Sequence, residues 1–166
     1  MKPPTADWEG DDMTSPADLW DEHGDYLVSL TTQFRDFGGK RRFCGPARTV
    51  RCIEDNVVLA ALLETPGEGA VLVVDGAGSL ACALMGDRIA GLAVAHGWNG
   101  VIIDGAVRDS VALAALPIGI KALGTNPRKS GKGGAGQTDV DLHIGGAVIR
   151  PGAMVHADED GVVVER

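Results

Sequence analysis

The chain has 166 residues, of which 45% are hydrophobic and 23% charged, and its formal net charge is −8. This length and composition fit one globular domain, and the acidic balance argues against nucleic-acid binding, which needs a basic surface for the phosphates. No apolar run approaches the roughly 20 residues that cross a bilayer, and no signal peptide follows Met1, so we expect a soluble, cytoplasmic protein.

Acidic side chains are concentrated at the N-terminus, where residues 1–26 contain eight acids and one lysine. We interpret residues 1–13 as a flexible acidic arm and residues 14–166 as a single domain. Ser15 followed by Pro16 predicts the start of a helix that runs through Glu22. Beyond it, the sequence predicts a loop over residues 34–45, a strand over 49–53 and a helix over 56–64.

The centre of the chain has the clearest pattern. Residues 70–74 form a short apolar run typical of a strand covered on both faces. A glycine-rich turn follows over residues 75–79, and then a helical stretch to His96, in which Gly86 is an interruption and Asp87 a new N-cap. Residues 101–103 predict the next strand, which ends at Asp104. Strand, helix and strand in this order predict a βαβ unit with parallel strands.

The last third of the chain changes character. Residues 110–115 predict a short helix and residues 118–123 a strand, and residues 125–138 are a loop rich in glycine and lysine. From Val140 onward, short apolar segments separated by glycine pairs and turns predict antiparallel strands. We therefore expect an α/β fold with a central βαβ unit and a β-rich C-terminal part.

Several motifs in the sequence are not functional sites on this interpretation. Gly131, Gly133 and Gly136 match the GxGxxG spacing, but no strand leads into them and no helix follows. The segment 124–130 resembles a phosphate-binding loop, except that Arg128 stands where the second glycine is needed. The three cysteines and four histidines lack zinc-ligand spacing, so no zinc site and no disulfide framework is indicated.

Three segments are expected at the carboxyl ends of the parallel strands, where ligands of such sheets bind. They are residues 75–79, 86–89 and 104–109. Amide groups at a helix N-terminus can receive a carboxylate, Arg108 offers paired donors, and Asp109 is a hard oxygen ligand for Mg²⁺ or Mn²⁺. The residues alone leave two alternatives, an anion and metal site or an ordinary exposed ion pair.

Four blocks of the sequence, residues 37–56, 76–110, 118–130 and 145–164, resemble the RraA-like proteins and the related 4-hydroxy-4-methyl-2-oxoglutarate aldolases. The enzymes of this family share an aspartate, twenty intervening residues and then Arg-Asp, which Asp87, Arg108 and Asp109 match. The resemblance implies a swivelling β/β/α domain, assembled as a homotrimer or a dimer of trimers.

The resemblance also implies roles for particular residues. Asp109 would hold a divalent cation, Mg²⁺ or Mn²⁺, and Arg108 would contact the 2-oxo oxygen of the substrate. Asp87 would orient water on the metal or the hydrogen bonds of the site. The substrate carboxylate would bind to the backbone of Gly86, Asp87, Arg88 and Ile89. No Schiff-base lysine is needed, and nothing in the sequence marks Lys121 as buried.

The implied activity is that of a class II, metal-dependent aldolase or an oxaloacetate decarboxylase, both of which pass through a pyruvate enolate. The alternative is a regulator that binds and inhibits ribonuclease E without catalysis. Such regulators can lack the last aspartate of the motif, so Asp109 favours the enzyme. Aldolase members often have a longer C-terminal extension, which favours decarboxylation here. An older name for such proteins, menaquinone-pathway methyltransferase, finds no support in the glycine motifs.

Overall fold

The computed structural model describes residues 14–166, and the predicted arm over residues 1–13 lies outside the described residues. The described elements are, in chain order, α1 (Pro16–His23), the 3-10 turn η1 (Gly24–Tyr26), β1 (Leu27–Ser29), β2 (Arg35–Asp36), β3 (Phe43–Arg51), α2 (Val57–Leu63), β4 (Val71–Asp75), β5 (Ala83–Met85), α3 (Asp87–Ala95), β6 (Gly100–Val107), α4 (Ser110–Leu113), β7 (Gly119–Thr125), β8 (Gln137–Thr138), β9 (Leu142–Ile144), β10 (Ala147–Ile149), β11 (Met154–Asp158) and β12 (Gly161–Glu165).

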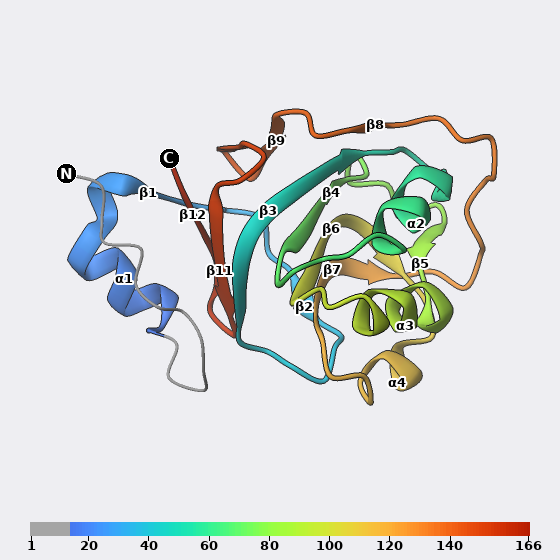
Figure 1. The fold of residues 1–166 in the computed structure, drawn as a ribbon, viewed down its shortest axis with the longest axis horizontal. Coiled ribbons are helices and arrows are strands. Elements are labelled where there is room, and N and C mark those ends of the chain that lie inside the picture. Colours follow the sequence, from blue (N-terminus) through green and yellow to red (C-terminus); the bar gives the residue numbers. More distant parts are fainter. Residues whose placement is uncertain (1–13) are drawn as a thin grey trace.

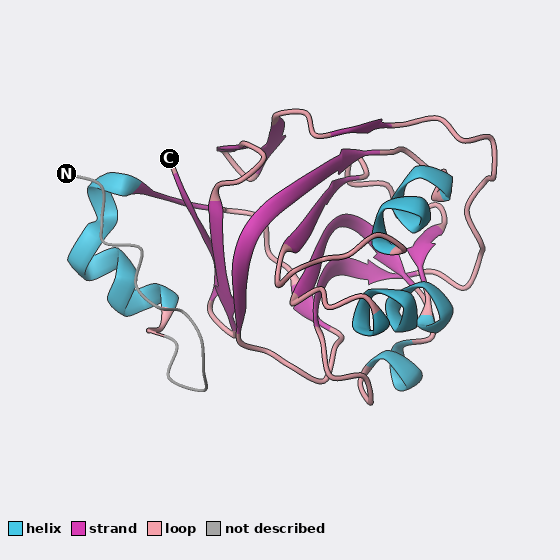
Figure 2. Cartoon of the chain, in the orientation of Figure 1, coloured by secondary structure: helices cyan, strands magenta, loops and turns pink. Residues whose placement is uncertain are grey.

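One long sheet, in the order β1-β12-β11-β3-β4-β6-β7-β2, organises the domain. Its centre, β3-β4-β6-β7, is parallel, and its two ends are antiparallel. Helices α2, α3 and α4 gather on one side of the parallel strands, whereas α1 lies at the far end of the molecule beside β11 and β12 (Figure 1 and Figure 2). The architecture is therefore the α/β fold with a β-rich C-terminal part that the sequence pattern predicted, in the β/β/α arrangement that the family resemblance implied.

The central strands lie between two apolar cores, which explains why their sequences are continuous hydrophobic runs. In β4, Leu72 and Val74 face the core beneath the helices, while Val71 and Val73 face a second core against the C-terminal strands. A strand covered on both faces has no polar face, so its sequence does not alternate. A small third cluster, Leu19, Leu27 and Val163, fixes α1 to the outer face of β1 and β12.

Much of the predicted secondary structure is confirmed. Helix α1 begins at Pro16 with the Ser15 hydroxyl accepting a hydrogen bond from the Asp18 N–H, 3.1 Å away. The parallel pairing of β4 with β6 around α3 is present, and the last four strands pair as antiparallel hairpins. None of the helices in residues 14–166 has the length and apolar character that a bilayer crossing requires.

Other predictions about the elements were wrong. Residues 80–86 are not helical, because β5 pairs in parallel with β6, and α3 begins at Asp87 with Gly86 as its N-cap. Strand β6 continues past Asp104 to Val107 through a register shift, and β3 starts at Phe43 rather than at residue 49. In each case pairing with a distant strand overrides the local preference of the sequence.

Lys121, which no pattern in the sequence marked as buried, is 1% exposed. It lies on β7, where its Nζ is 2.8 Å from Asp36 Oδ1 of β2. Its strand neighbours Ile120 and Ala122 belong to the core beneath the helices, so Lys121 points to the opposite face of the sheet. Burial without a partner carboxylate would be costly, and the ion pair accounts for a lysine in this position.

Burial of His156 generates a prediction about stability. The side chain is 1% exposed in β11, opposite Cys44 and Val163, and burial lowers its pKa to about 4 from 6.5. Between pH 6.5 and 4, His156 is therefore protonated in the unfolded chain but remains neutral in the folded chain. We expect the free energy of unfolding to fall across this window as pH decreases, by at most about 3 kcal/mol from this group.

Urea unfolding measured at pH 7, 5.5 and 4.5 checks this expectation, with His156→Gln flattening the dependence on pH. His143 is exposed on β9, so His143→Gln is the matched control and should leave the dependence unchanged. An equal slope in the wild-type chain and in His156→Gln would show that His156 does not contribute.

Candidate functional site

The ends of two neighbouring strands meet at the beginning of α3. Strand β5 ends at Met85 and leads through Gly86 into the helix, while β6 ends at Val107 and is followed by Arg108 and Asp109. The Arg108 N–H donates to the Met85 carbonyl at 2.9 Å. The Asp87 N–H donates to Asp109 Oδ2 at 3.1 Å. These two contacts place the predicted Arg-Asp pair against the N-terminus of the helix.

Gly86 leaves room for this arrangement. A Cβ atom added there would lie 2.4 Å from Asp109 Oδ2, far inside van der Waals contact. The backbone of Gly86 has an ordinary φ of −126°, so space and not conformation requires the glycine. Asp109 itself has φ 59°, in the left-handed region that aspartate adopts more readily than most residues. The Asp109 carboxylate therefore lies against the α3 N-terminus, where the Asp87 N–H donates to it and no side chain of residue 86 stands in the way.

A cavity of about 60 Å³ opens where these segments meet. It brings together every sequence-predicted site residue, namely Gly86, Asp87, Arg88, Ile89, Arg108 and Asp109. A second hollow of about 280 Å³ adjoins it and is lined by Arg108, Asp109, Ser110, Thr125, Asn126 and Pro127. Arg108 and Asp109 line both spaces.

The cavity suits an anion. Helix α3 has nine residues, and the N–H groups of its first turn have no acceptor within the helix. Asp109 accepts from Asp87, which leaves the N–H groups of Arg88 and Ile89 for another acceptor at the positive end of the helix dipole. Arg108 adds a guanidinium, whose Nη1 donates to the Pro127 carbonyl at 3.3 Å.

The oxygen ligands fit a magnesium-like ion. Asp109 Oδ1 accepts no hydrogen bond from the described residues, and the exposed Asp87 carboxylate lines the same cavity. Within residues 14–166, no group of three or more His, Cys, Asp or Glu side chains could enclose a metal. Mg²⁺ commonly binds to one or two carboxylates and keeps several waters, whereas structural Zn²⁺ needs four protein ligands. Asp109, with Asp87 nearby, would hold such an ion.

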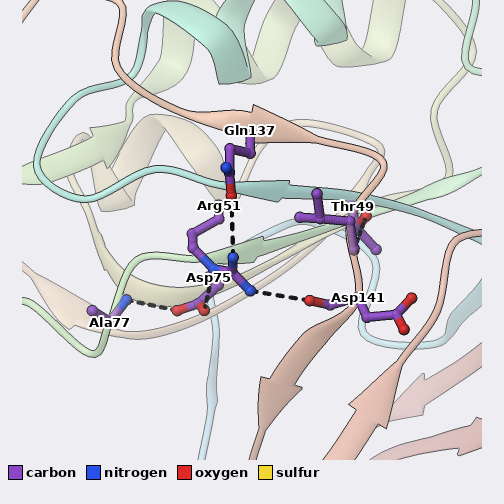
Figure 3. A network of polar contacts seen from close by, with 7 residues as sticks. Thr49, Arg51, Asp75, Ala77, Gln137 and Asp141 are labelled. Atoms are coloured by element: carbon purple, nitrogen blue, oxygen red, sulfur yellow. Dashed lines mark hydrogen bonds and ion pairs between the residues drawn. The ribbon is translucent and has the colours of Figure 1, made fainter.

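The turn over residues 75–79, which was expected at the site, does not line the cavity. Asp75 instead accepts from Arg51 Nε at 3.4 Å and from the Ala77 N–H at 2.9 Å, and Arg51 also reaches Gln137 and the carbonyl of Asp141 (Figure 3). Asp104 lies beside Asp75 on β6, where burial and the Asp75 charge raise its pKa. Neither Asp75 nor Asp104 lines the cavity that Arg108 lines.

The structure adds four polar residues that the sequence analysis did not place at the site: Asn56, Lys129, Ser130 and Lys132. Asn56 is buried at the start of α2, and its Nδ2 donates to the Leu84 carbonyl at 3.0 Å. Lys132 Nζ lies 2.6 Å from Asn56 Oδ1. The only signal in the sequence was the lysine- and glycine-rich composition of residues 125–138, which says nothing about where that loop packs.

Comparison with known proteins finds a matching family and several similar solved structures. The sequence model of the family described as RraA-like, aldolase/RraA, matches residues 16–164. The solved S-adenosylmethionine:2-dimethylmenaquinone methyltransferase of Geobacillus kaustophilus is 51% identical, with a TM-score of 0.90 over 92% of this chain and 94% of that one. The RNA-processing inhibitor RraA of Thermus thermophilus is 43% identical, with a TM-score of 0.89 over 92% and 93%.

A more distant relative has the same fold. Streptomyces coelicolor RraAS2, a member of the RNase ES inhibitor RraA family, is 28% identical, with a TM-score of 0.75 over 91% of this chain and 79% of that one. The likeness therefore extends across the whole described domain and is not confined to the site.

The close approach at Gly86 predicts a stability effect. Gly86→Ala should cost about 1–3 kcal/mol of the free energy of unfolding, because the methyl group displaces the Asp109 carboxylate from the Asp87 N–H. Gly91 lies in the same helix with nothing within 4 Å of an added Cβ, so Gly91→Ala should stabilise by about 0.5–1 kcal/mol. Urea unfolding measures both changes.

Introducing Gly86→Ala into a chain that already carries Asp109→Gly tests whether the Asp109 carboxylate causes the loss of stability. Glycine accepts the left-handed conformation and carries no carboxylate, so Gly86→Ala should then cost much less than in the wild-type chain. An undiminished cost in that background would show that Asp109 is not what the methyl group meets.

Proposed function

The chain belongs to the RraA-like family, and from this premise we propose that it is a divalent-metal-dependent carbon–carbon lyase that acts on small 2-oxo acids through a pyruvate enolate. The observation that carries the proposal is the shared cavity of Arg108, Asp109 and the α3 N-terminus. These are a cationic donor, a metal-binding carboxylate and a carboxylate receptor, the three groups that a 2-oxo acid needs.

Substrate placement follows from the direction of the donors. The substrate carboxylate accepts from the Arg88 and Ile89 N–H groups at the start of α3. The 2-oxo group, attached to the next carbon, then lies within reach of the Arg108 guanidinium and of an ion on Asp109. The second hollow, which shares Arg108 and Asp109 with the cavity, has room for the part of the substrate that leaves.

The chemistry requires that negative charge develop on the 2-oxo oxygen. In oxaloacetate the bond between C3 and C4 breaks, carbon dioxide leaves, and the bonding electrons form the pyruvate enolate, which water then protonates at C3. Arg108 stabilises the enolate oxygen more than the neutral carbonyl of the substrate, which lowers the barrier. A bound divalent cation would supply further Lewis-acid stabilisation of this charge.

Decarboxylation demands less of this site than aldol cleavage. Retro-aldol cleavage needs a base to remove the proton of the 4-hydroxyl group, whereas loss of carbon dioxide needs none. Asp87 and Asp109 are the two carboxylates that line the cavity, and Asp109 is already engaged by the Asp87 N–H. We infer that oxaloacetate is turned over more readily than 4-hydroxy-4-methyl-2-oxoglutarate.

Regulation of a ribonuclease is the second candidate function, and the 43% identity with an RNA-processing inhibitor favours it. A protein-binding surface and a catalytic cavity can coexist on one domain. The name methyltransferase is not carried over, because the glycine turn after β4 leads into β5 and not into the helix that a methyl-donor site of the usual kind requires. Assembly as a homotrimer or dimer of trimers stays a prediction, which light scattering tests.

A pyruvate-release assay on oxaloacetate, with Mg²⁺ and with a chelator, tests the proposal. We expect metal-dependent turnover, and a loss of about a hundredfold or more in Arg108→Gln and in Asp109→Asn. The first variant removes the cationic donor to the enolate oxygen, and the second removes the carboxylate that would hold the metal ion. Asparagine also tolerates the left-handed backbone of residue 109, so the fold should persist.

Matched controls are available for both variants. Arg150 is an exposed arginine near Asp141, and Asp139 is an exposed aspartate with φ 55° that pairs with Arg48. Arg150→Gln and Asp139→Asn should retain wild-type turnover. A wild-type rate no greater than that of Mg²⁺ alone would contradict the lyase proposal and favour the regulatory one.

A further inference from the structure

The Arg108 side chain is held by a backbone carbonyl and not by a carboxylate. Its Nη1 donates to the Pro127 carbonyl at 3.3 Å, and within residues 14–166 this is the one hydrogen bond of the side chain. None of the six ion pairs in that range includes Arg108, although Asp87 and Asp109 line the same cavity. A paired carboxylate would cancel much of the charge that a ligand meets, whereas a neutral carbonyl orients the guanidinium and leaves its charge available.

The Pro127 carbonyl belongs to a tight turn that follows β7. Asn126 Oδ1 accepts the Arg128 N–H at 3.0 Å, which closes the turn around Pro127. Asparagine side chains often form such turns with the N–H two residues later, and proline adds a fixed φ. The turn therefore restricts where the Pro127 carbonyl can point.

Asn126 also attaches this turn to two segments beside the site. Its N–H donates to the Val107 carbonyl at 3.0 Å, at the end of β6 and directly before Arg108. Its Nδ2 donates to the Leu80 carbonyl at 2.7 Å. Leu80 follows the glycine turn over residues 75–79, so that turn, which does not line the cavity, supports the site indirectly through Asn126.

Replacing Asn126 with alanine would remove both side-chain bonds of this residue. The turn would lose its contact with Leu80 and its closure by the Arg128 N–H, and the Pro127 carbonyl would no longer be fixed. Arginine has a long side chain with many rotamers, so a guanidinium without a fixed partner spends less time where a ligand oxygen can meet it. The loss would therefore appear at Arg108.

We propose that Asn126 is a positioning residue for the arginine of the site: it holds the Pro127 carbonyl where that carbonyl directs Arg108 toward the ligand oxygen. The inference rests on the proposed function for the oxygen that Arg108 meets. Both ends of the Asn126 amide group are engaged by the backbone, so its role requires no contact with the ligand. Its removal should weaken the interactions made by Arg108 and spare the metal-binding carboxylate of Asp109.

A double-mutant cycle on oxalate binding tests this role. Oxalate is an unreactive, planar analogue of the pyruvate enolate, and it lacks the leaving part of the substrate, which the second hollow would receive and which Asn126 could touch there. Titration calorimetry in excess Mg²⁺ should show a loss of oxalate affinity of about fivefold in Asn126→Ala and about tenfold or more in Arg108→Gln. In a chain that already carries Arg108→Gln, Asn126→Ala should change the affinity by less than about twofold, because the arginine through which Asn126 acts is gone.

A conservative variant and a matched control accompany the cycle. Serine can still accept the Arg128 N–H, so Asn126→Ser should bind oxalate more tightly than Asn126→Ala and less tightly than the wild-type chain. Asn99 precedes β6 at the opposite end of the strand, where its Nδ2 donates to the Cys44 carbonyl at 2.9 Å. Asn99→Ala also removes a bond from an amide to a carbonyl, and it should keep wild-type oxalate affinity.

Metal binding separates a positioning role from a general loss of structure. Asn126→Ala should bind Mn²⁺ as the wild-type chain does, measured by electron paramagnetic resonance. A parallel loss of Mn²⁺ binding overturns the inference, because Asn126 would then support the whole site. So does wild-type oxalate affinity in Asn126→Ala, or an equal loss with and without Arg108. If thermal unfolding shows that the alanine variant does not fold, the serine variant takes its place in the cycle.

The result is distinguishable from the outcome of the turnover assay. Coupling between Asn126 and Arg108 in oxalate binding, in a protein that releases no pyruvate from oxaloacetate, would contradict the lyase and support the positioning role. Pyruvate release without such coupling would support the lyase and contradict the positioning role. With both in place, Asn126→Ala should lower kcat on oxaloacetate about tenfold and change KM by less than about threefold, because the Arg108 contact strengthens as charge develops.

Discussion

The hydrogen bond from the Asp87 N–H to Asp109 Oδ2 is the contact on which the site depends. It joins the beginning of α3 to the residue pair that follows β6, across 22 positions of the chain. It forms only because Gly86 has no side chain and because Asp109 adopts a left-handed conformation. With this bond in place, the Arg108 guanidinium, the helix N-terminus and a free carboxylate oxygen surround one cavity.

The cavity is completed by a segment from a different part of the chain. Residues 129–134 are held beside it by the Asp55 carboxylate, which accepts the Gly134 N–H, and by backbone hydrogen bonds of Gly131 with Glu54 and Asn56. Lys129 and Lys132 of this segment line the cavity. In the proposed function, the β6–α3 half holds the reacting end of a 2-oxo acid.

Sequence reasoning placed the first half of this site and not the second. Asp87, Arg108 and Asp109 follow predicted strands and helix starts, so topology alone brings them near one sheet edge. Asn56 and Lys132 meet across 76 residues, and no local pattern encodes such a contact. The same reason explains the fold: β4 and β6 were predicted from apolar runs, whereas β5, whose sequence suits a helix, is a strand because β6 lies beside it. The burial of Lys121 and its ion pair with Asp36 likewise could not be predicted from the residues around Lys121 in the sequence.

The most direct test of the account is whether Asp109 provides the metal ligand. Electron paramagnetic resonance of added Mn²⁺ measures the free ion, and therefore binding, without reference to any substrate. We expect the wild-type chain and Asp139→Asn to bind Mn²⁺ alike, and Asp109→Asn to bind it at least about tenfold more weakly. Mn²⁺ binding of wild-type strength in Asp109→Asn would contradict the central claim.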